Sequence, residues 1–137
     1  MNLAGELAVA VWGRAGDRCQ YCLMHQSLQG ATFHIEHIIP RAKGGSSEMA
    51  NLALACPSCN LQKADRTTVI DPVSGSRVQL FHPIQQTWSE HFHFVGHRIE
   101  GLTPIGRAAV AALEFNHPRR QRIRAAEKRF GLFPPIR

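Results

Sequence analysis

The sequence predicts a protein of the α+β class. Three observations support this prediction. A run rich in alanine, leucine and valine near the N-terminus has helical composition, short β-branched and aromatic runs bounded by glycine and proline fill much of the rest, and the last third carries helix-capping signals. At 137 residues, the length fits one domain with one modest core.

The first half should hold two helices and two strand-like segments. The expected elements are a helix over residues 6–14, a strand over 31–39, a glycine loop over 43–47, a short return segment over 51–55 and a helix over 60–63. Pro40 should end the strand, because proline has no N–H to donate to a ladder. Gly44 and Gly45 favour a loop, because glycine adds backbone freedom and little burial.

The second half should hold short strands followed by two helices. The expected elements are a turn over residues 71–76, a strand over 77–81, a half-buried strand around 92–95, a turn at 96–97 into residues 98–102, and helices over 104–113 and 119–130. Thr103 and Pro104 are typical of a helix start, with threonine as N-cap and proline at the first helical position. Gly131 is a typical residue to close the last helix.

The charge balance favours a polyanionic partner. The formal net charge is +6 with histidine neutral, and phosphate contacts dominate affinity for nucleic acids. No apolar stretch reaches the length of about 20 residues that a membrane span requires. The first residues lack the basic region of a signal peptide, so we expect a cytoplasmic protein that does not engage membranes.

All four cysteines fall into two C-x-x-C knuckles, Cys19 with Cys22 and Cys56 with Cys59. In a reducing compartment such pairs are more often zinc ligands than disulfides, and two knuckles complete a tetrahedral shell of four sulfurs. Two disulfides, or four unrelated core cysteines, are the alternatives. The spacing between the knuckles exceeds that of simple zinc ribbons, so a substructure must lie between them.

That substructure carries groups suited to phosphodiester hydrolysis. A histidine can deprotonate water near neutral pH, and a divalent metal can stabilise the phosphorane charge and the leaving oxygen. His37 is the candidate base, and Glu36 can hold a hard metal through oxygen. Asn60 offers a second oxygen ligand directly after the second knuckle, and Asn51 can brace the loop that holds His37.

These residues resemble the HNH endonucleases, whose fold is called ββα-metal. The resemblance spans Cys19 to Lys63 and rests on Glu36-His37-Ile38-Ile39-Pro40, Gly44-Gly45, Asn51-Leu52, the second knuckle, Asn60 and Lys63. It implies an HNH core over about residues 17–68. Residues 69–137 would form a C-terminal extension of short strands and two helices, packed on the core within one domain, 1–137.

The resemblance also implies roles for single residues. His37 matches the general base, Glu36 the acidic metal ligand before it, Asn51 the residue that orients the base, and Asn60 the last metal ligand. The four cysteines match a structural zinc site, and His34 matches an extra polar group that touches substrate or metal. Glutamate replaces the commoner aspartate, and asparagine replaces the final histidine, so catalytic Mg²⁺ or Mn²⁺ fits better than catalytic zinc.

Basic residues other than the candidate catalytic groups are candidate phosphate contacts. Arg120 and Arg124 align on one face of the last predicted helix, with Ile123, Ala126 and Phe130 on the opposite side facing the core. Lys63 either contacts phosphate or is solvated. The same arginines would otherwise form an ordinary solvated face.

The predicted function is a metal-dependent DNA endonuclease. A zinc-dependent nucleic-acid-binding module without catalysis is the main alternative, and RNA cleavage at the same site is a third. The sequence predicts neither the target, the oligomeric state nor the biological role.

Overall fold

The computed structural model describes residues 5–135, which form five α-helices and three two-stranded antiparallel sheets. The α-helices are α1 (Gly5–Ala15), α2 (Pro57–Lys63), α3 (Trp88–His91), α4 (Pro104–Ala112) and α5 (Pro118–Arg129). The sheets pair β1 (His34–His37) with β2 (Leu52–Ala55), β3 (Thr68–Ile70) with β4 (Arg77–Gln79), and β5 (Phe92–Val95) with β6 (Arg98–Gly101). The predicted α+β class is confirmed.

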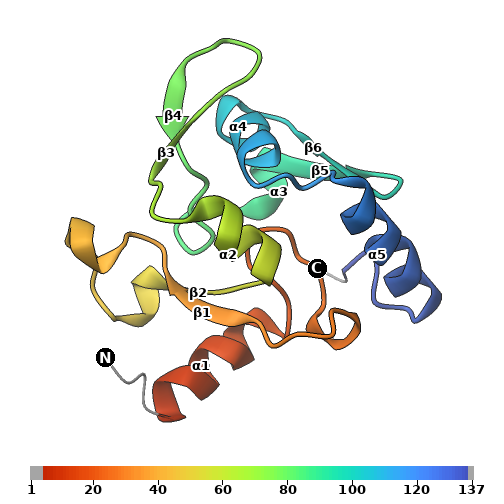
Figure 1. Cartoon of the computed structure of the whole chain (residues 1–137), viewed down its shortest axis with the longest axis horizontal. Helices are drawn as coiled ribbons and strands as arrows, with labels where there is room; N and C mark the ends of the chain where they lie inside the picture. The colour runs from red at the N-terminus through yellow and green to blue at the C-terminus, as the bar shows by residue number, and fades with distance from the viewer. Residues whose placement is uncertain (1–4, 136–137) are drawn as a thin grey trace.

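The first sheet and the helix after it form a ββα unit. β1 pairs with β2 so that His34 faces Ala55 and His37 faces Leu52. Figure 1 shows α1 on one side of this hairpin and α2 on the other. All four residues of β2 are fully buried, which explains why this strand is a continuous apolar run.

Helix α2 begins at Pro57, inside the second knuckle, and not at residue 60 as the sequence predicts. Cys56 is its N-cap, because the cysteine sulfur accepts a hydrogen bond from the backbone N–H of Cys59. Proline fits the first helical position, where no N–H is required. The knuckle is therefore also the first turn of the helix.

The extension packs its strands and α4 together, as the upper part of Figure 1 shows. Three predicted features are confirmed there: the turn after Asp71, the hairpin of β5 and β6, and the start of α4, where Thr103 accepts a hydrogen bond from the backbone N–H of Gly106. The strand predicted over residues 77–81 is shorter and ends at Gln79, after which the buried side chains of Leu80 and Phe81 enter the core. The short elements β3 and α3 were not predicted.

Close backbone contact explains the glycines on either side of Thr103. A Cβ added to Gly106 would lie 2.0 Å from the carbonyl oxygen of His91, and one added to Gly101 would lie 2.3 Å from the backbone nitrogen of Arg107. Only glycine permits such an approach between β6, α3 and the start of α4.

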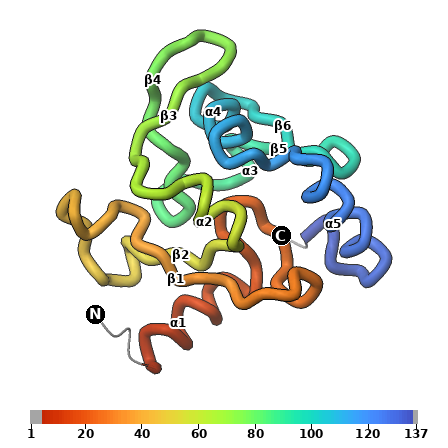
Figure 2. Tube along the Cα trace, viewed as in Figure 1, coloured from red at the N-terminus to blue at the C-terminus, as the bar shows by residue number. Residues whose placement is uncertain are grey.

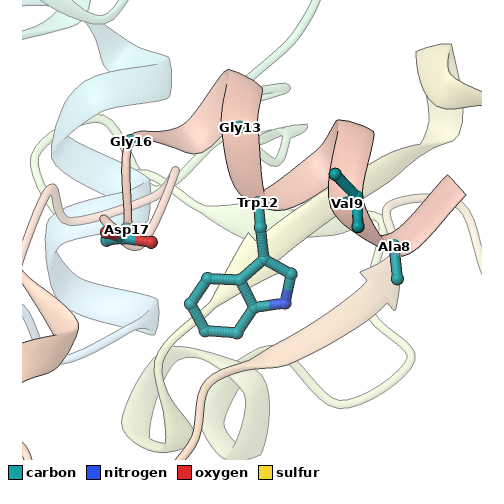
Figure 3. A pocket seen from close by; sticks show the side chains of 6 residues that line it. All are labelled: Ala8, Val9, Trp12, Gly13, Gly16 and Asp17. Carbon is teal, nitrogen blue, oxygen red and sulfur yellow. The ribbon is translucent and has the colours of Figure 1, made fainter. Parts of the chain in front are cut away.

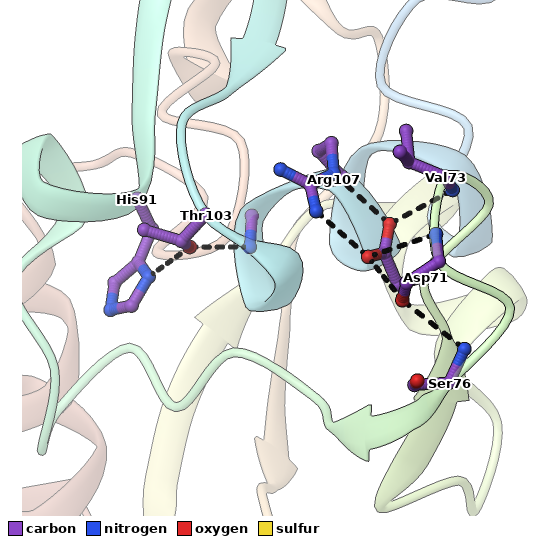
Figure 4. A network of polar contacts seen from close by, with 8 residues as sticks. Asp71, Val73, Ser76, His91, Thr103 and Arg107 are labelled. Atoms are coloured by element: carbon purple, nitrogen blue, oxygen red, sulfur yellow. Dashed lines mark hydrogen bonds and ion pairs between the residues drawn. The ribbon is translucent and has the colours of Figure 1, made fainter.

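An ion pair fastens α4 to the turn between β3 and β4 (Figure 4). The Arg107 guanidinium donates two hydrogen bonds to the carboxylate of Asp71, at 3.1 and 2.8 Å. Asp71 is fully buried and also accepts from the backbone N–H of Val73 and from Ser74. These donors, the arginine first, lower the pKa of Asp71 below its usual value.

Helix α5 lies beside the segment that follows the first knuckle (Figure 2). The backbone N–H of His25 donates to Glu127 at 3.1 Å, and the Arg18 guanidinium donates to the carbonyl oxygen of Leu132 at 2.6 Å. Asn116 joins β6 to the start of α5 through two hydrogen bonds with the backbone of Ile99. The last helix therefore packs against the first part of the chain.

Candidate zinc centre and active site

The four cysteines meet in one buried cluster. Their sulfur atoms all lie within 4.8 Å of one another, and the sulfurs of Cys22 and Cys56 are 3.8 Å apart. A tetrahedral zinc with Zn–S distances of about 2.3 Å has sulfur–sulfur edges of about 3.8 Å, whereas a disulfide bond is only about 2.05 Å long. The cysteines are free, and their arrangement fits one structural zinc ion.

Backbone donors complete the two knuckles. The N–H of Cys22 points at the sulfur of Cys19 at 3.5 Å, and the N–H of Cys59 points at the sulfur of Cys56 at 3.4 Å. Hydrogen bonds of this kind favour the thiolate form that binds metal. The local backbone therefore prepares both knuckles for the ion.

The candidate base, His37, ends β1 and is half-buried. Its Nε2 atom lies 2.9 Å from the hydroxyl oxygen of Ser47, in the loop between β1 and β2. Burial lowers the pKa of His37 below its usual value, and the positive charge of Arg41 lowers this pKa further. The imidazole is therefore neutral at pH 7, as a proton acceptor must be.

Asn51 ties down the backbone that follows His37. Its side-chain oxygen accepts from the N–H of Ile39 at 2.8 Å, and its NH₂ group donates to the carbonyl oxygens of Ile39 and Ser46 at 3.0 and 2.8 Å. A Cβ on Gly45 would lie 1.7 Å from the Ile39 carbonyl oxygen, so this loop also requires glycine at that position. The bracing contacts agree with the predicted place of Asn51, and its effect on catalysis stays a prediction.

Glu36 is buried and already has two partners. Its carboxylate accepts a hydrogen bond from the Tyr21 hydroxyl and forms an ion pair with Lys63 at 3.1 Å. Burial raises the pKa of Glu36, while the positive charge of Lys63 and the hydrogen bond from Tyr21 oppose that increase. Any metal bound here would share this carboxylate with Lys63.

Lys63 is neither solvated nor exposed to a substrate in this structure. Its side chain is 1% exposed, and its ammonium also donates to the carbonyl oxygen of His37 at 3.4 Å. The ion pair with Glu36 is the physical reason, because a buried ammonium requires a buried counter-charge. The predicted phosphate contact at Lys63 is therefore not supported.

Asn60 and His34 keep their side chains available. Asn60 is half-buried on α2, and its side-chain amide makes no hydrogen bond with any residue between 5 and 135. His34 is exposed on β1. Glu36 and Asn60 fit a hard divalent ion by ligand type, with water as its other ligands. Among the residues described, the four cysteines are the one gathering of three or more Cys, His, Asp or Glu ligand atoms.

The basic stripe predicted on the last helix points inward, which corrects two candidate phosphate contacts. Arg120 and Arg124 are only 2% and 1% exposed, whereas Phe130 is 70% exposed and Ala126 also faces solvent. Arg124 donates to the carbonyl oxygens of His97 and Phe115, at 2.9 and 2.6 Å. Arg120 donates to backbone carbonyl oxygens and to cysteine sulfur, so its guanidinium contacts buried protein groups and is not exposed to a phosphate.

Sequence reasoning missed two contacts of the site. Tyr21 lies inside the first knuckle and reaches Glu36 across 15 positions of the chain, and Ser47 reaches His37 across 10. No periodic pattern signals either contact. The signal available for Tyr21 was its uniqueness, because it is the one tyrosine in the sequence and it stands within a metal-binding motif.

A separate hollow lies along α1 and the two residues that follow it. Figure 3 shows its lining, to which none of the candidate site residues contributes: Ala8, Val9, Trp12, Gly13, Gly16 and Asp17. We assign it no part in the chemistry.

Comparison with known proteins shows a family similarity over the ββα unit. The family model described as HNH endonuclease matches residues 19–66, which is 48 of the 137 residues. Searches of curated proteins and of solved structures found no match. No helix in residues 5–135 combines the length and apolar character needed to cross a membrane. Residues 19–66 are therefore similar to HNH endonucleases, and they carry the four-cysteine cluster that the knuckle motifs predict.

Proposed function

We propose that this protein is a metal-dependent endonuclease that hydrolyses phosphodiester bonds in DNA. The observation that carries the proposal is the position of His37. It ends the first strand of an HNH segment as a neutral, half-buried imidazole, next to a buried carboxylate and braced by Asn51. A protein that only bound nucleic acid would have no use for a histidine held in this way.

His37 would remove the proton from the attacking water. If its Nε2–H donates to the Ser47 hydroxyl, the Nδ1 atom keeps a free lone pair that can take this proton. Asn51 keeps the loop after His37 in place, so the imidazole ring is already oriented before the substrate binds. Ser47 is therefore part of the proposed site.

Glu36 and Asn60 are the residues that would hold one Mg²⁺ or Mn²⁺ ion. Such an ion, when bound, stabilises negative charge on the phosphate and on the departing 3′ oxygen. Tyr21 and Lys63 orient the Glu36 carboxylate, and Asn60 lies on α2, whose start is fixed by the second knuckle. Cleavage should leave 5′-phosphate and 3′-hydroxyl ends.

The surface near His37 suits a polyanion. Arg41 and Lys43 are exposed in the loop after β1, and the chain carries a formal net charge of +6. His34 is exposed on the same strand as His37 and is a candidate contact to the substrate.

A plasmid assay tests the proposal directly. Supercoiled DNA is incubated with zinc-loaded protein and Mg²⁺ or Mn²⁺, and the ends are mapped by sequencing. We expect nicking by the wild type and a loss of at least about 100-fold in His37→Ala, since general-base catalysis contributes about that much. His93→Ala, an exposed histidine on β5, is the matched control and should keep full activity.

Cleavage that persists in His37→Ala would reject His37 as the general base. A wild type that fails to cut DNA with either Mg²⁺ or Mn²⁺ would reject the proposed endonuclease activity. The second outcome would favour a zinc-dependent nucleic-acid-binding module. The observation that favours this binding module is the ion pair of Lys63 with Glu36, which already neutralises the carboxylate proposed to bind the catalytic metal. That alternative predicts DNA binding that weakens steeply with salt and survives His37→Ala.

A further inference from the structure

A zinc ion held by four thiolates creates an electrostatic problem in the core of this protein. Four thiolates and one Zn²⁺ leave two uncompensated negative charges, and the four cysteine side chains are almost completely buried. Excess charge away from water is costly unless a counter-charge or hydrogen-bond donors lie nearby. The surroundings of the cluster should therefore contain a cation.

Arg120 is that cation. Its Nη2 atom lies 3.1 Å from the sulfur of Cys59 and 3.7 Å from the sulfur of Cys56, although more than 60 residues separate them in sequence. Within residues 5–135, no other charged side chain donates a hydrogen bond to a cysteine sulfur.

The guanidinium of Arg120 is held firmly in this position. Its Nη1 atom donates to the carbonyl oxygens of Leu113 and Glu114, at 2.6 and 3.1 Å. The ring of Phe115 lies 5.5 Å from its central carbon, within the range of a cation–π contact. Two sulfurs, two carbonyl oxygens and one aromatic ring thus fix the guanidinium plane against the second knuckle. The helix that carries Arg120, α5, belongs to the C-terminal extension.

We propose that Arg120 is the counter-ion of the zinc–thiolate centre and that it slows loss of the metal. A hydrogen bond from a cation withdraws electron density from a thiolate, which makes the sulfur less reactive toward oxidants and stabilises four like charges around one ion. Arg120 is therefore a positioning residue for the zinc centre. The proposal requires zinc at the four cysteines, and it does not depend on DNA cleavage.

Arg124 provides a matched control on the same helix. It is as buried as Arg120 and also donates to two backbone carbonyl oxygens, but it makes no hydrogen bond to sulfur. Replacing either arginine with methionine removes a buried guanidinium and keeps most of the aliphatic stem. A merely structural role predicts similar consequences for both substitutions, whereas the proposal separates them.

The test measures the metal centre itself in the full-length protein. Zinc release from the zinc-loaded wild type, Arg120→Met and Arg124→Met is followed with a chromogenic chelator, with and without hydrogen peroxide. Arg120→Met should release zinc about 10- to 100-fold faster, the usual effect of losing an outer-shell partner. Arg124→Met should have a clearly smaller effect, because the Arg124 guanidinium lies near Cys22 and Cys59 but donates no hydrogen bond to sulfur. In cobalt-loaded protein, the thiolate-to-metal charge-transfer bands should shift for Arg120→Met alone.

Equal release rates and identical bands for the two variants would overturn the proposal, and so would a wild type that binds no zinc. If Arg120→Met does not fold, the wild type loaded with ¹¹³Cd supplies the decision. The Nη2 protons of Arg120 should then show scalar coupling to cadmium in NMR spectra. Slowly exchanging Nη2 protons without that coupling would overturn the proposal.

Discussion

Asn51 shows how much a single amide can do at the candidate site. Its three hydrogen bonds join backbone groups on both sides of the loop after His37. Asn60, in contrast, makes no side-chain hydrogen bond within residues 5–135, so the two asparagines form a natural pair for comparison. Both would reduce cleavage when truncated, for different reasons.

We predict that Asn51→Ala lowers the free energy of unfolding by about 1–3 kcal/mol, because it leaves buried backbone groups without partners. Asn60→Ala should change it by no more than about 0.5 kcal/mol. Urea denaturation of the zinc-loaded proteins measures both values. Equal losses would mean that the bracing contacts of Asn51 do not hold the loop.

The pair of Glu36 and Lys63 makes a second prediction, about pH. Breaking a buried ion pair by removing one partner typically costs about 3–5 kcal/mol, so Lys63→Met should be strongly destabilised at pH 7–8. The folded-state pKa of Glu36 is raised, so stability associated with its protonated form is present at low pH and is lost as pH rises above about 4.5.

Loss of Lys63 should raise the pKa of Glu36 further. The difference in unfolding free energy between the wild type and Lys63→Met should therefore shrink as pH falls toward about 4, where Glu36 becomes neutral. Denaturation curves at several pH values, without added Mg²⁺, measure this difference. A difference that is constant with pH would show that the charge of Glu36 is not the cause.

Among single residues, the sequence could nominate candidates for a role but could not predict their contacts. His37, Glu36 and Asn60 could be nominated because their residue types and spacing suit one reaction, and their roles stay predictions. Lys63 and Arg120 could not be interpreted correctly, because the groups they contact lie 27 and about 60 positions away and a solvated lysine or arginine has the same local sequence. Burial of a charge depends on the tertiary fold, which no local pattern encodes.

At the scale of elements, close packing decides which glycines can be replaced. Gly106 lies against the His91 carbonyl oxygen, whereas Gly13 is exposed inside α1 with nothing within 4 Å of an added Cβ. We predict that Gly106→Ala lowers the melting temperature by several degrees or more, because the backbones of α3 and α4 must separate. Gly13→Ala should raise stability by about 0.5–1 kcal/mol, through helix propensity alone.

Thermal melting followed by circular dichroism separates the two glycine variants. A Gly106→Ala protein that melts with the wild type would show that α3 and α4 can move apart at little cost. A Gly13→Ala protein that melts lower would show that α1 makes a contact at that position which requires glycine.

Elements with capping signals or clear periodicity could be predicted, and very short ones could not. Thr103, Pro104 and Gly131 correctly marked helix ends, because their conformations are local. Strand β3 has three residues and α3 has four, and such lengths carry too little pattern to recognise. Their existence depends on the partners against which they pack.

At the scale of the whole molecule, contacts cross between the HNH segment and the extension at several places. The Trp88 indole N–H donates to the carbonyl oxygen of Tyr21 at 2.9 Å, inside the first knuckle. Glu127 and Leu132 contact the chain around that same knuckle, and Arg120 contacts the second. The extension therefore contacts the chain at both knuckles of the cysteine cluster, and the single domain over residues 1–137 stays a prediction.

In a single cooperative domain, release of zinc and unfolding of the C-terminal extension should occur together. In Trp12→Phe, Trp88 is the one remaining tryptophan and reports on the extension, while a zinc-sensitive dye reports on the knuckles. We predict that the two signals change in a single thermal transition, and that a chelator lowers the Trp88 transition by at least about 10 °C, because zinc binding contributes folding free energy. His37→Ala should leave both transitions near those of the parent. An extension that keeps its own transition after zinc is removed would mean that residues 69–137 fold independently, because their contacts with the knuckles would then be unnecessary for their stability.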